Sequence, residues 1–279
     1  MARKNTRPAA RARVSAPKRD RASPVAGRPG AALITGASRR IGRAIALDLA
    51  AQGWSIAVHY NASRAAADAL VREIQAMGSR AIALKADLAR ETETGSLVPR
   101  ASSALGPLSC LINNAALFER DEALDVTRAS WDAHMETNLR APFVLTQAFA
   151  RQLPPRARGN VINLIDERVW NLTPHFTSYT VSKYALWGLT RTLALALAPR
   201  IRVNAIGPGP TLPSPRQTKA QFQRQNRAMP LGHGATPLDI ARAVRFIIEA
   251  PAMTGQMLAL DGGQHLAWTQ PSERTAEKE

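Results

Sequence analysis

The stretch that decides the fold is AALITGASRRIG, residues 31–42. Its apolar first half predicts a buried strand over residues 31–35, and the second half predicts a tight turn with glycine at both ends, Gly36 and Gly42. Apolar residues then recur at helical spacing from Arg43 to Gln52. A strand, a glycine turn and a helix in this order offer backbone N–H groups and a positive helix end to a pyrophosphate. The spacing is not GxGxxG, so this stretch alone is also compatible with a plain strand-to-helix turn.

The alternation of strand and helix patterns continues along the rest of the chain. Short apolar runs predict strands at 31–35, 54–60, 81–85, 108–112, 160–165, 201–206 and 256–260, with helical stretches between them. This pattern predicts an α/β fold: a doubly wound, Rossmann-type parallel sheet of about seven strands with helices on both faces. The active site is then expected at the carboxyl ends of the strands. Residues 209–235 are rich in Pro, Gln and Arg and predict a mobile loop over the substrate.

Composition restricts the class of protein. The chain has 279 residues, 45% of them hydrophobic, but no apolar run reaches the ~18 residues that cross a bilayer. Its one cysteine, Cys110, lies in an apolar run, as expected of a buried residue in a reducing, cytoplasmic compartment. The five histidines show no ligand spacing, so no metal site is predicted.

The net charge of +16 is unevenly distributed. Residues 1–30 hold nine of the 37 Lys and Arg residues and one of the 21 acidic residues, without apolar periodicity. We expect a disordered basic leader over 1–29, a single domain over 30–269 and a polar tail over 270–279. The leader is most simply a solvated tail, although a tether for nucleic acid or an acidic partner and an organelle transit peptide are alternatives.

A second informative stretch is YTVSK, residues 179–183. Tyr179 and Lys183, four residues apart, lie on the same face of a helix. A cation close to the phenol favours phenolate and lowers the pKa of the tyrosine from about 10, so that it can exchange a proton with a substrate. Most isolated pairs of this kind are ordinary helix surface, so the pair carries an argument only together with other motifs.

Together these motifs resemble the short-chain dehydrogenase/reductase family over residues 31–268. Thr35 to Gly42 resembles its TGxxxGxG turn, with Arg40 at the place of the middle glycine. Asn113 to Ala116 resembles its NNAG segment, Asn138 its helix asparagine, and Pro208-Gly209 its PG turn. The resemblance implies a homotetramer built through long helices over about 125–153 and 177–199. It also implies cofactor contacts from Gly36, Ser38, Arg39, Arg40, Ile41, Gly42, His59, Asn61, Ser63, Arg64, Asp87, Leu88, Asn114, Ala115, Lys183, Pro208 and Gly209.

The segment after the second predicted strand indicates the cofactor. An acidic residue there would hold the ribose 2′-hydroxyl of NAD, but residues 59–64 read HYNASR. Arg39, Arg40, Ser63 and Arg64 are instead available to a 2′-phosphate, which favours NADPH. Arg64 could also simply begin a helix in solvent. Asp87 resembles the family's adenine-contacting residue, with a plain turn or N-cap role as the alternative.

Asp166 is the main departure from the family pattern. Most members have a serine thirteen residues before the tyrosine, where this chain has Asp166. A carboxylate is poorly suited to stabilise a carbonyl oxygen that gains negative charge. When ionised, it also raises the pKa of Tyr179. The arrangement suits a substrate whose nitrogen must be protonated, as in reduction of a C=N bond. The resemblance therefore implies catalytic roles for Tyr179, Lys183, Asp166 and Asn138.

The departure resembles pteridine reductases and dihydromonapterin reductases, which share Asp166, Arg40 and an aromatic residue at Phe118. The implied pose stacks a pterin on the Phe118 ring, with Asp166 and Tyr179 also contacting it. Ala116 replaces a serine found in some of these enzymes, and residues 209–215 differ from their substrate loops. Phe118 as a core aromatic and Asp166 as a drifted position in an inactive protein are the alternatives.

Three functions follow, in decreasing order of support. The first is an NADPH-dependent reductase of a dihydropterin or dihydrofolate-like substrate. The second is a carbonyl reductase, for instance of a 3-oxoacyl thioester, in which Asp166 is tolerated. The third is a non-enzymatic protein that senses NADPH and binds a partner through its basic leader. Competent side chains at the other catalytic positions favour an enzyme.

Overall fold

The computed structural model describes residues 29–214 and 216–266. The predicted polar tail and all but the last residue of the predicted basic leader lie outside the described residues. Within them, no helix combines the length and the apolar character needed to span a bilayer.

Seven parallel strands form one sheet in the order β3-β2-β1-β4-β5-β6-β7. The strands are β1 (Ala31–Ile34), β2 (Ser55–Tyr60), β3 (Ala81–Lys85), β4 (Leu108–Asn113), β5 (Gly159–Leu164), β6 (Ile201–Pro208) and β7 (Met257–Leu260). The predicted doubly wound α/β sheet is therefore confirmed. Strand order reverses between β1 and β4, which creates a crevice at their carboxyl ends.

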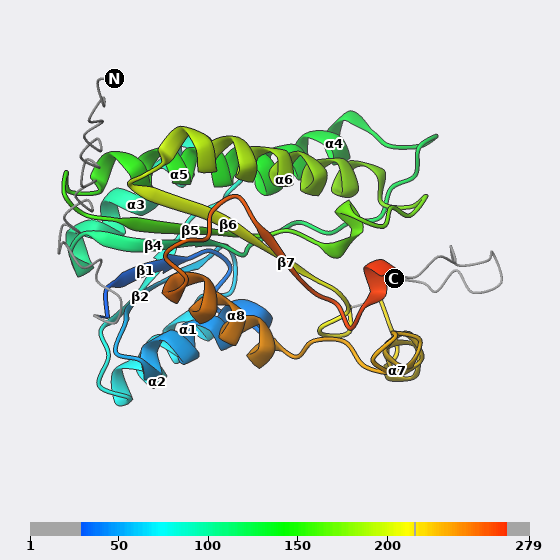
Figure 1. The fold of residues 1–279 in the computed structure, drawn as a ribbon, viewed down its shortest axis with the longest axis horizontal. Helices are drawn as coiled ribbons and strands as arrows, with labels where there is room; N and C mark the ends of the chain where they lie inside the picture. The colour runs from blue at the N-terminus through cyan, green and yellow to red at the C-terminus, as the bar shows by residue number, and fades with distance from the viewer. Residues whose placement is uncertain (1–28, 215, 267–279) are drawn as a thin grey trace, which may run out of the picture.

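Helices cover both faces of this sheet (Figure 1). On one side lie α1 (Arg40–Ala51), α2 (Arg64–Ala76) and α8 (Pro237–Glu249). On the other lie α3 (Glu91–Leu105), α4 (Arg128–Met135), α5 (Ala141–Gln152) and α6 (Thr177–Leu197). A π-helical turn, η1 (Glu136–Arg140), joins α4 to α5, so the helix expected over about 125–153 has a π segment in its middle.

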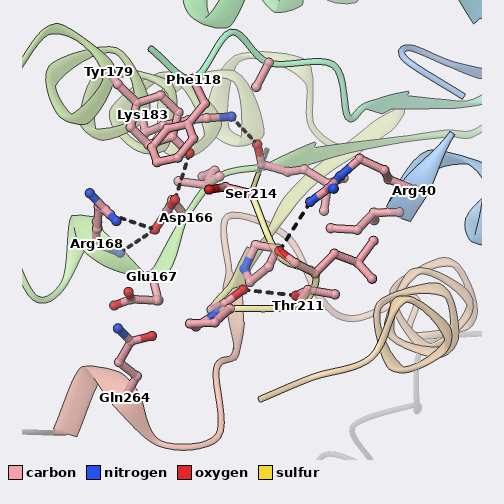
Figure 2. A pocket seen from close by; sticks show the side chains of 18 of the residues that line it. Arg40, Phe118, Asp166, Glu167, Arg168, Tyr179, Lys183, Thr211, Ser214 and Gln264 are labelled. Atoms are coloured by element: carbon pink, nitrogen blue, oxygen red, sulfur yellow. Dashed lines mark hydrogen bonds and ion pairs between the residues drawn. The ribbon is translucent and has the colours of Figure 1, made fainter. Parts of the chain in front are cut away.

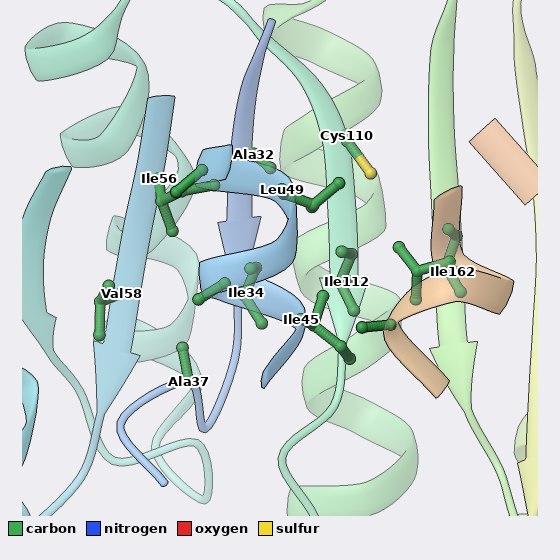
Figure 3. Packing of buried hydrophobic residues seen from close by; sticks show 14 of the residues in the cluster. Ala32, Ile34, Ala37, Ile45, Leu49, Ile56, Val58, Cys110, Ile112 and Ile162 are labelled. Carbon is green, nitrogen blue, oxygen red and sulfur yellow. The ribbon is translucent and has the colours of Figure 1, made fainter. Parts of the chain in front are cut away.

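The strands read as continuous apolar runs because both faces are buried. Ile34 and Ile112 pack with Ile45 and Leu49 of α1 (Figure 3), whereas neighbouring strand residues such as Leu33 point to the α3–α5 layer. Two apolar layers thus hold the strand ends, and the turns that follow them, in fixed positions.

The segment 209–235, predicted as a loop, contains a helix, α7 (Lys219–Arg227). Thr218 and Gln221 form a capping box, in which each side chain bonds the other residue's backbone N–H. None of the side chains of α7 is buried, so the apolar period that marks the other helices is lacking. In Figure 1, α7 lies beyond the sheet, near the described C-terminal end.

Candidate active site

A cavity of about 290 Å³ opens at the carboxyl ends of the strands. Its lining includes Arg40 of the glycine turn, Phe118 after β4, Asp166 after β5, and Tyr179 and Lys183 of α6 (Figure 2). Leu212, after β6, also lines it. The structure therefore brings together the four predicted residues that carry the chemical argument, Phe118, Asp166, Tyr179 and Lys183.

Tyr179 and Asp166 are joined directly. The phenol of Tyr179 donates to Oδ2 of Asp166 at 2.7 Å. Oδ1 of the same carboxylate accepts from the backbone N–H of Arg168 at 3.0 Å, and Nε of Arg168 lies 3.9 Å from it. Figure 2 shows Tyr179 and Arg168 approaching the carboxylate from different sides. The arrangement fixes the carboxylate and aims the phenolic proton at it.

Lys183 lies buried beneath the tyrosine. Its ammonium donates to the carbonyl of Leu164 at 2.8 Å and lies 5.8 Å from the centre of the Tyr179 ring. Burial lowers the pKa of Lys183 from 10.5 to about 8, while the negative charge of Asp166 acts in the opposite direction. A positive charge at neutral pH, close to phenol and carboxylate, favours proton transfer out of Tyr179.

Asn138 occupies the π-helical turn η1 and is completely buried. Its amide oxygen accepts from the N–H of Leu117 at 2.8 Å, and its nitrogen donates to the Leu117 carbonyl and to Oγ of Ser182, each at 3.0 Å. Ser182 in turn donates to the Tyr179 carbonyl at 2.7 Å. The side chain therefore ties the segment before Phe118 to the helix of Tyr179, and its catalytic role stays a prediction.

Phe118 is both a packing residue and a wall of the cavity. It stacks on Phe176 with the ring centres 4.6 Å apart and the planes 11° apart. Its ring also meets Tyr179 edge-on at 4.6 Å. The guanidinium of Arg168 lies 5.6 Å from the ring centre and that of Arg216 lies 5.5 Å from it. Because Phe176 covers one face, a planar ligand could stack only on the opposite face of Phe118.

The glycine turn has the shape of a phosphate cradle. Gly36 has a φ of +61°, and a Cβ added to Gly42 would lie 2.5 Å from the Gly36 carbonyl oxygen. The first turn of α1 follows at once, so its N–H groups lack intrahelical acceptors. Asn114 closes the turn by donating to the carbonyls of Thr35 and Gly36 at 2.8 and 3.3 Å. These residues fit the pyrophosphate of a dinucleotide.

Arg40 takes the left-handed conformation, with a φ of +52°, at the place of the family's middle glycine. Its guanidinium donates to the carbonyls of Pro213 and Leu212 at 2.9 and 3.3 Å. The Arg40 side chain, predicted to contact the 2′-phosphate of the cofactor, thus reaches across the cavity and binds the segment after β6. Of its neighbours, Arg39 is exposed, Ser38 is buried, and Ile41 lines the cavity.

His59 lies under the turn instead of at its surface. It is 1% exposed, accepts from the N–H of Gly36 at Nδ1 (3.0 Å) and faces the carbonyl of Ala86 with Nε2 (3.1 Å). Burial lowers the pKa of His59 to about 4, against the opposing effect of the Ala86 bond, so the ring is neutral with its proton on Nε2. The side chain supports the turn from below, and a cofactor contact from His59 stays a prediction.

The remaining predicted cofactor residues lie at or just after the carboxyl ends of β2, β3, β4 and β6. Arg64 is exposed and lies 3.5 Å from Asp68, one helical turn ahead. Asp87 accepts from the N–H of Ala89 at 3.0 Å, as a turn residue does. The side chain of Leu88 is buried in the core, so only its backbone is available to a ligand. The others are Asn61 (exposed), Ser63 (half-buried), Ala115, whose N–H bonds Thr35, and Pro208 and Gly209 at the end of β6.

Sequence reasoning missed Phe176, Arg168 and Arg216. Phe176 precedes α6 and has a φ of +60°, which no sequence signal announces. Arg216 reaches back to Glu119 at 2.8 Å and to the Phe118 carbonyl at 2.8 Å. Trp170, four residues after Asp166, is half-exposed and packs edge-on against His265.

Comparison with known proteins places this geometry among reductases. Residues 36–265 match the family model described as enoyl-(acyl carrier protein) reductase. The 3-oxoacyl-[acyl-carrier-protein] reductase FabG of Staphylococcus epidermidis is 34% identical over 243 residues, which are 84% of this chain and 98% of the relative.

Two solved structures extend the comparison. FolM alternative dihydrofolate reductase 1 from Brucella canis, complexed with NADP, has a TM-score of 0.83 at 44% identity and covers 90% of this chain and 99% of its own. A short chain dehydrogenase from Burkholderia cenocepacia, in complex with NADP, has a TM-score of 0.79 at 36% identity. The match covers 85% of this chain and 97% of that one.

Proposed function

The chain belongs to the short-chain dehydrogenase/reductase family, and we propose that it is an NADPH-dependent reductase of the C=N bond of a dihydropterin or dihydrofolate-like substrate. The observation that carries this proposal is the hydrogen bond of 2.7 Å between the phenol of Tyr179 and the carboxylate of Asp166. A carboxylate in this place suits a substrate with N–H donors and a nitrogen to be protonated.

Three residues divide the proton chemistry. Tyr179 holds the proton that passes to the ring nitrogen, and Asp166 orients the phenol. The ammonium of Lys183 stabilises the negative charge left on the phenol after transfer. When bound, NADPH supplies the hydride to the neighbouring ring carbon. The proton from Tyr179 and this hydride would together saturate the C=N bond.

Three observations support NADPH and the class of substrate. The NADP complexes of the solved relatives, at 36% and 44% identity, agree with Arg39 in the glycine turn and Arg64 after β2. The name of the Brucella canis relative, an alternative dihydrofolate reductase, agrees with the flat aromatic wall at Phe118. The cavity is of a size that admits a small planar heterocycle.

A second function has its own support. FabG from Staphylococcus epidermidis, at 34% identity, acts on a 3-oxoacyl carrier-protein thioester, as its name states. We retain reduction of such a carbonyl as the alternative, with the phenol of Tyr179 as the donor to the carbonyl oxygen. Against it stands Asp166, whose carboxylate would repel the developing oxyanion.

We also propose a homotetramer, as the family resemblance implies. Val181, Tyr184 and Leu195 are exposed apolar residues on α6, spaced so that they form one stripe along the helix. Light scattering of the purified full chain tests this. A monomer at assay concentration would contradict the tetramer without affecting the proposed reaction.

The decisive experiment is NADPH consumption by the purified protein with 7,8-dihydrobiopterin, dihydromonapterin and an acetoacetyl thioester. Each substrate is offered to wild type and to the Asp166→Ser variant. Turnover of a pterin that is lost in Asp166→Ser supports the C=N reductase. Thioester turnover that improves in Asp166→Ser, with both pterins inert, supports the carbonyl reductase instead.

A further inference from the structure

Beside the cavity lies a group of buried polar side chains that the proposed reaction does not use. Asp121 is 7% exposed, and His134 and Ser178 are 0% exposed. They come from the loop after β4, from α4 and from the first turn of α6. Buried polar groups of this kind are costly unless each one is hydrogen-bonded, so their bonds indicate what the group does.

Asp121 is the acceptor of the group. It accepts from Oγ of Ser130 at 2.6 Å, from the N–H of Ser178 at 3.0 Å, and from Oγ of Ser178. Burial acts to raise the pKa of Asp121, but the hydrogen bonds from Ser130 and Ser178 outweigh it and the pKa is lowered. Three donors directed at one carboxyl group favour its ionised form.

His134 has a defined tautomer. The backbone N–H of Glu119 donates to its Nε2 at 3.2 Å, so Nε2 is an acceptor and the proton lies on Nδ1. Nδ1 is 2.9 Å from the carbonyl of Ser130 and 2.7 Å from Oγ of Ser178. The group is not a hydrolytic triad, because Asp121 bonds Ser178 instead of His134 and the serine is buried.

The group binds the residues that adjoin Phe118 and Tyr179 in the chain. Glu119, held by His134, follows Phe118 directly in the chain. Ser178, held by Asp121, immediately precedes Tyr179, and the ring of His134 meets that of Tyr179 edge-on at 6.2 Å. The carbonyl of Asp121 also accepts from the N–H of Phe176 at 2.9 Å. A shift of any member would move Phe118, Tyr179 or the ring stacked on Phe118.

We propose that Asp121, His134 and Ser178 are positioning residues: they hold Phe118 and Tyr179 at the separation and angle that a planar substrate requires. The inference rests on the proposed function for its substrate, although both candidate reductions use Tyr179. The two ends of the group serve different steps. The bond from Glu119 to His134 sets Phe118 and hence substrate binding, whereas the bonds to Ser178 set Tyr179 and hence proton transfer.

Two substitutions of His134 separate these steps. In His134→Asn the amide reaches the place of Nδ1, so contact with Ser178 is kept while Glu119 loses its acceptor. We expect the KM for the pterin to rise about 10-fold while kcat changes by less than about 2-fold. In His134→Gln the amide reaches the place of Nε2, so the bond from the Glu119 N–H is kept and the contact with Ser178 is lost. There we expect kcat to fall about 10-fold with little change in KM.

Matched controls are Ser178→Ala against Ser103→Ala, and His134→Asn against His233→Asn. Ser103 and His233 are exposed, and their substitutions are expected to leave turnover unchanged. Ser178→Ala is expected to lower kcat at least as much as His134→Gln. The KM for NADPH is expected to stay unchanged in every variant. Equal effects of His134→Asn and His134→Gln on kcat and KM would overturn the division of roles.

Amide hydrogen exchange tests the positioning role of Asp121 and His134 independently of the substrate. His134→Asn should accelerate exchange at Glu119, and Asp121→Asn should accelerate it at Ser178, in folded protein. Unchanged exchange at both amides overturns the positioning group, whatever the enzyme reduces. A wild type inert towards pterins but active on the thioester contradicts the proposed function only, and the loss of kcat in His134→Gln is then expected with the thioester.

Discussion

The phenolic oxygen of Tyr179 lies 2.7 Å from Oδ2 of Asp166, a residue thirteen positions earlier in the chain. The carboxylate is held in turn by the backbone N–H of Arg168, and the ammonium of Lys183 lies beneath the tyrosine ring. Phenol, carboxylate and ammonium therefore form one proton-handling unit. The chemistry of this unit rests on the charge of Asp166, so replacing that residue is the most informative change.

Asp166→Asn and Asp166→Ser should each reduce pterin turnover by about 100-fold or more, because a positioned acid–base partner contributes about 100- to 10,000-fold. Asp166→Asn keeps the size of the side chain and removes only its charge. Initial rates of NADPH oxidation measure the effect. The control is Asp132→Ser, which removes a carboxylate whose ion pair with Arg128 is exposed. Undiminished turnover in Asp166→Asn would show that the carboxylate is not needed.

Gly42→Ala should weaken NADPH binding and destabilise the fold by about 1–3 kcal/mol, because the new methyl group would overlap the Gly36 carbonyl. Gly95→Ala is the matched control. It also lies in a helix, and its methyl group would meet Val144 at an ordinary 3.9 Å. It should stabilise the protein by about 0.5–1 kcal/mol. Urea unfolding and NADPH fluorescence titration of both variants test this, and similar behaviour of the two would be the contrary result.

Arg40→Gly and Arg40→Ala separate backbone strain from the loss of the guanidinium. Both remove the bonds to Leu212 and Pro213, so both should raise the KM for the substrate to the same degree. Only glycine accepts a φ of +52° without strain, so Arg40→Gly should be about 1 kcal/mol more stable than Arg40→Ala. Thermal unfolding compares the two variants. Equal stability would mean that the turn relaxes in Arg40→Ala.

The cofactor preference should depend on Arg39 and Arg64. The double variant Arg39→Ala/Arg64→Ala should raise the KM for NADPH about 10-fold or more, since a hydrogen bond to a charged group contributes about 1.5–3 kcal/mol. The KM for NADH should stay the same, because NADH lacks the 2′-phosphate. Arg72→Ala, an exposed change on the same helix α2, is the control. An equal rise in the KM for NADPH and for NADH would show that the arginines do not contact the 2′-phosphate.

Lys183 should make stability depend on pH in the alkaline range. Its pKa is about 8 in the folded protein and 10.5 as the ordinary value. Below pH 8 the side chain is charged in both states, and the full cost of burying the ammonium is present. Between pH 8 and 10.5 the unfolded chain binds more protons than the folded one, so stability rises with pH, by on the order of 3 kcal/mol.

Lys183→Met should abolish this rise, because the substituted side chain has no charge to lose. Urea unfolding of wild type and variant across the same pH series gives the difference, in which other titrating groups cancel. Lys219→Met, on the exposed helix α7, should leave the wild-type rise intact. A rise that persists in Lys183→Met would assign the pH dependence to other groups.

Much of the fold followed from local patterns. The apolar runs of the seven strands were placed to within a few residues, because a parallel sheet covered on both faces demands continuous burial. Helix α7 was missed because no face of it is buried, so it has a capping box but no apolar period. Gly42 could be recognised from its spacing, and its necessity is visible only in the approach of the Gly36 carbonyl.

The sequence by itself determined the class of sheet, the family, and the four residues Phe118, Asp166, Tyr179 and Lys183 that meet in the cavity. It could do so because each belongs to a local motif at the end of a strand or on one helix face. Only the tertiary structure decided that Arg40 binds the segment at Pro213, 173 residues away, and that Asp121 holds Ser178, 57 residues away. Such bonds depend on how the strand ends and helices are placed in space, and no local pattern encodes that placement.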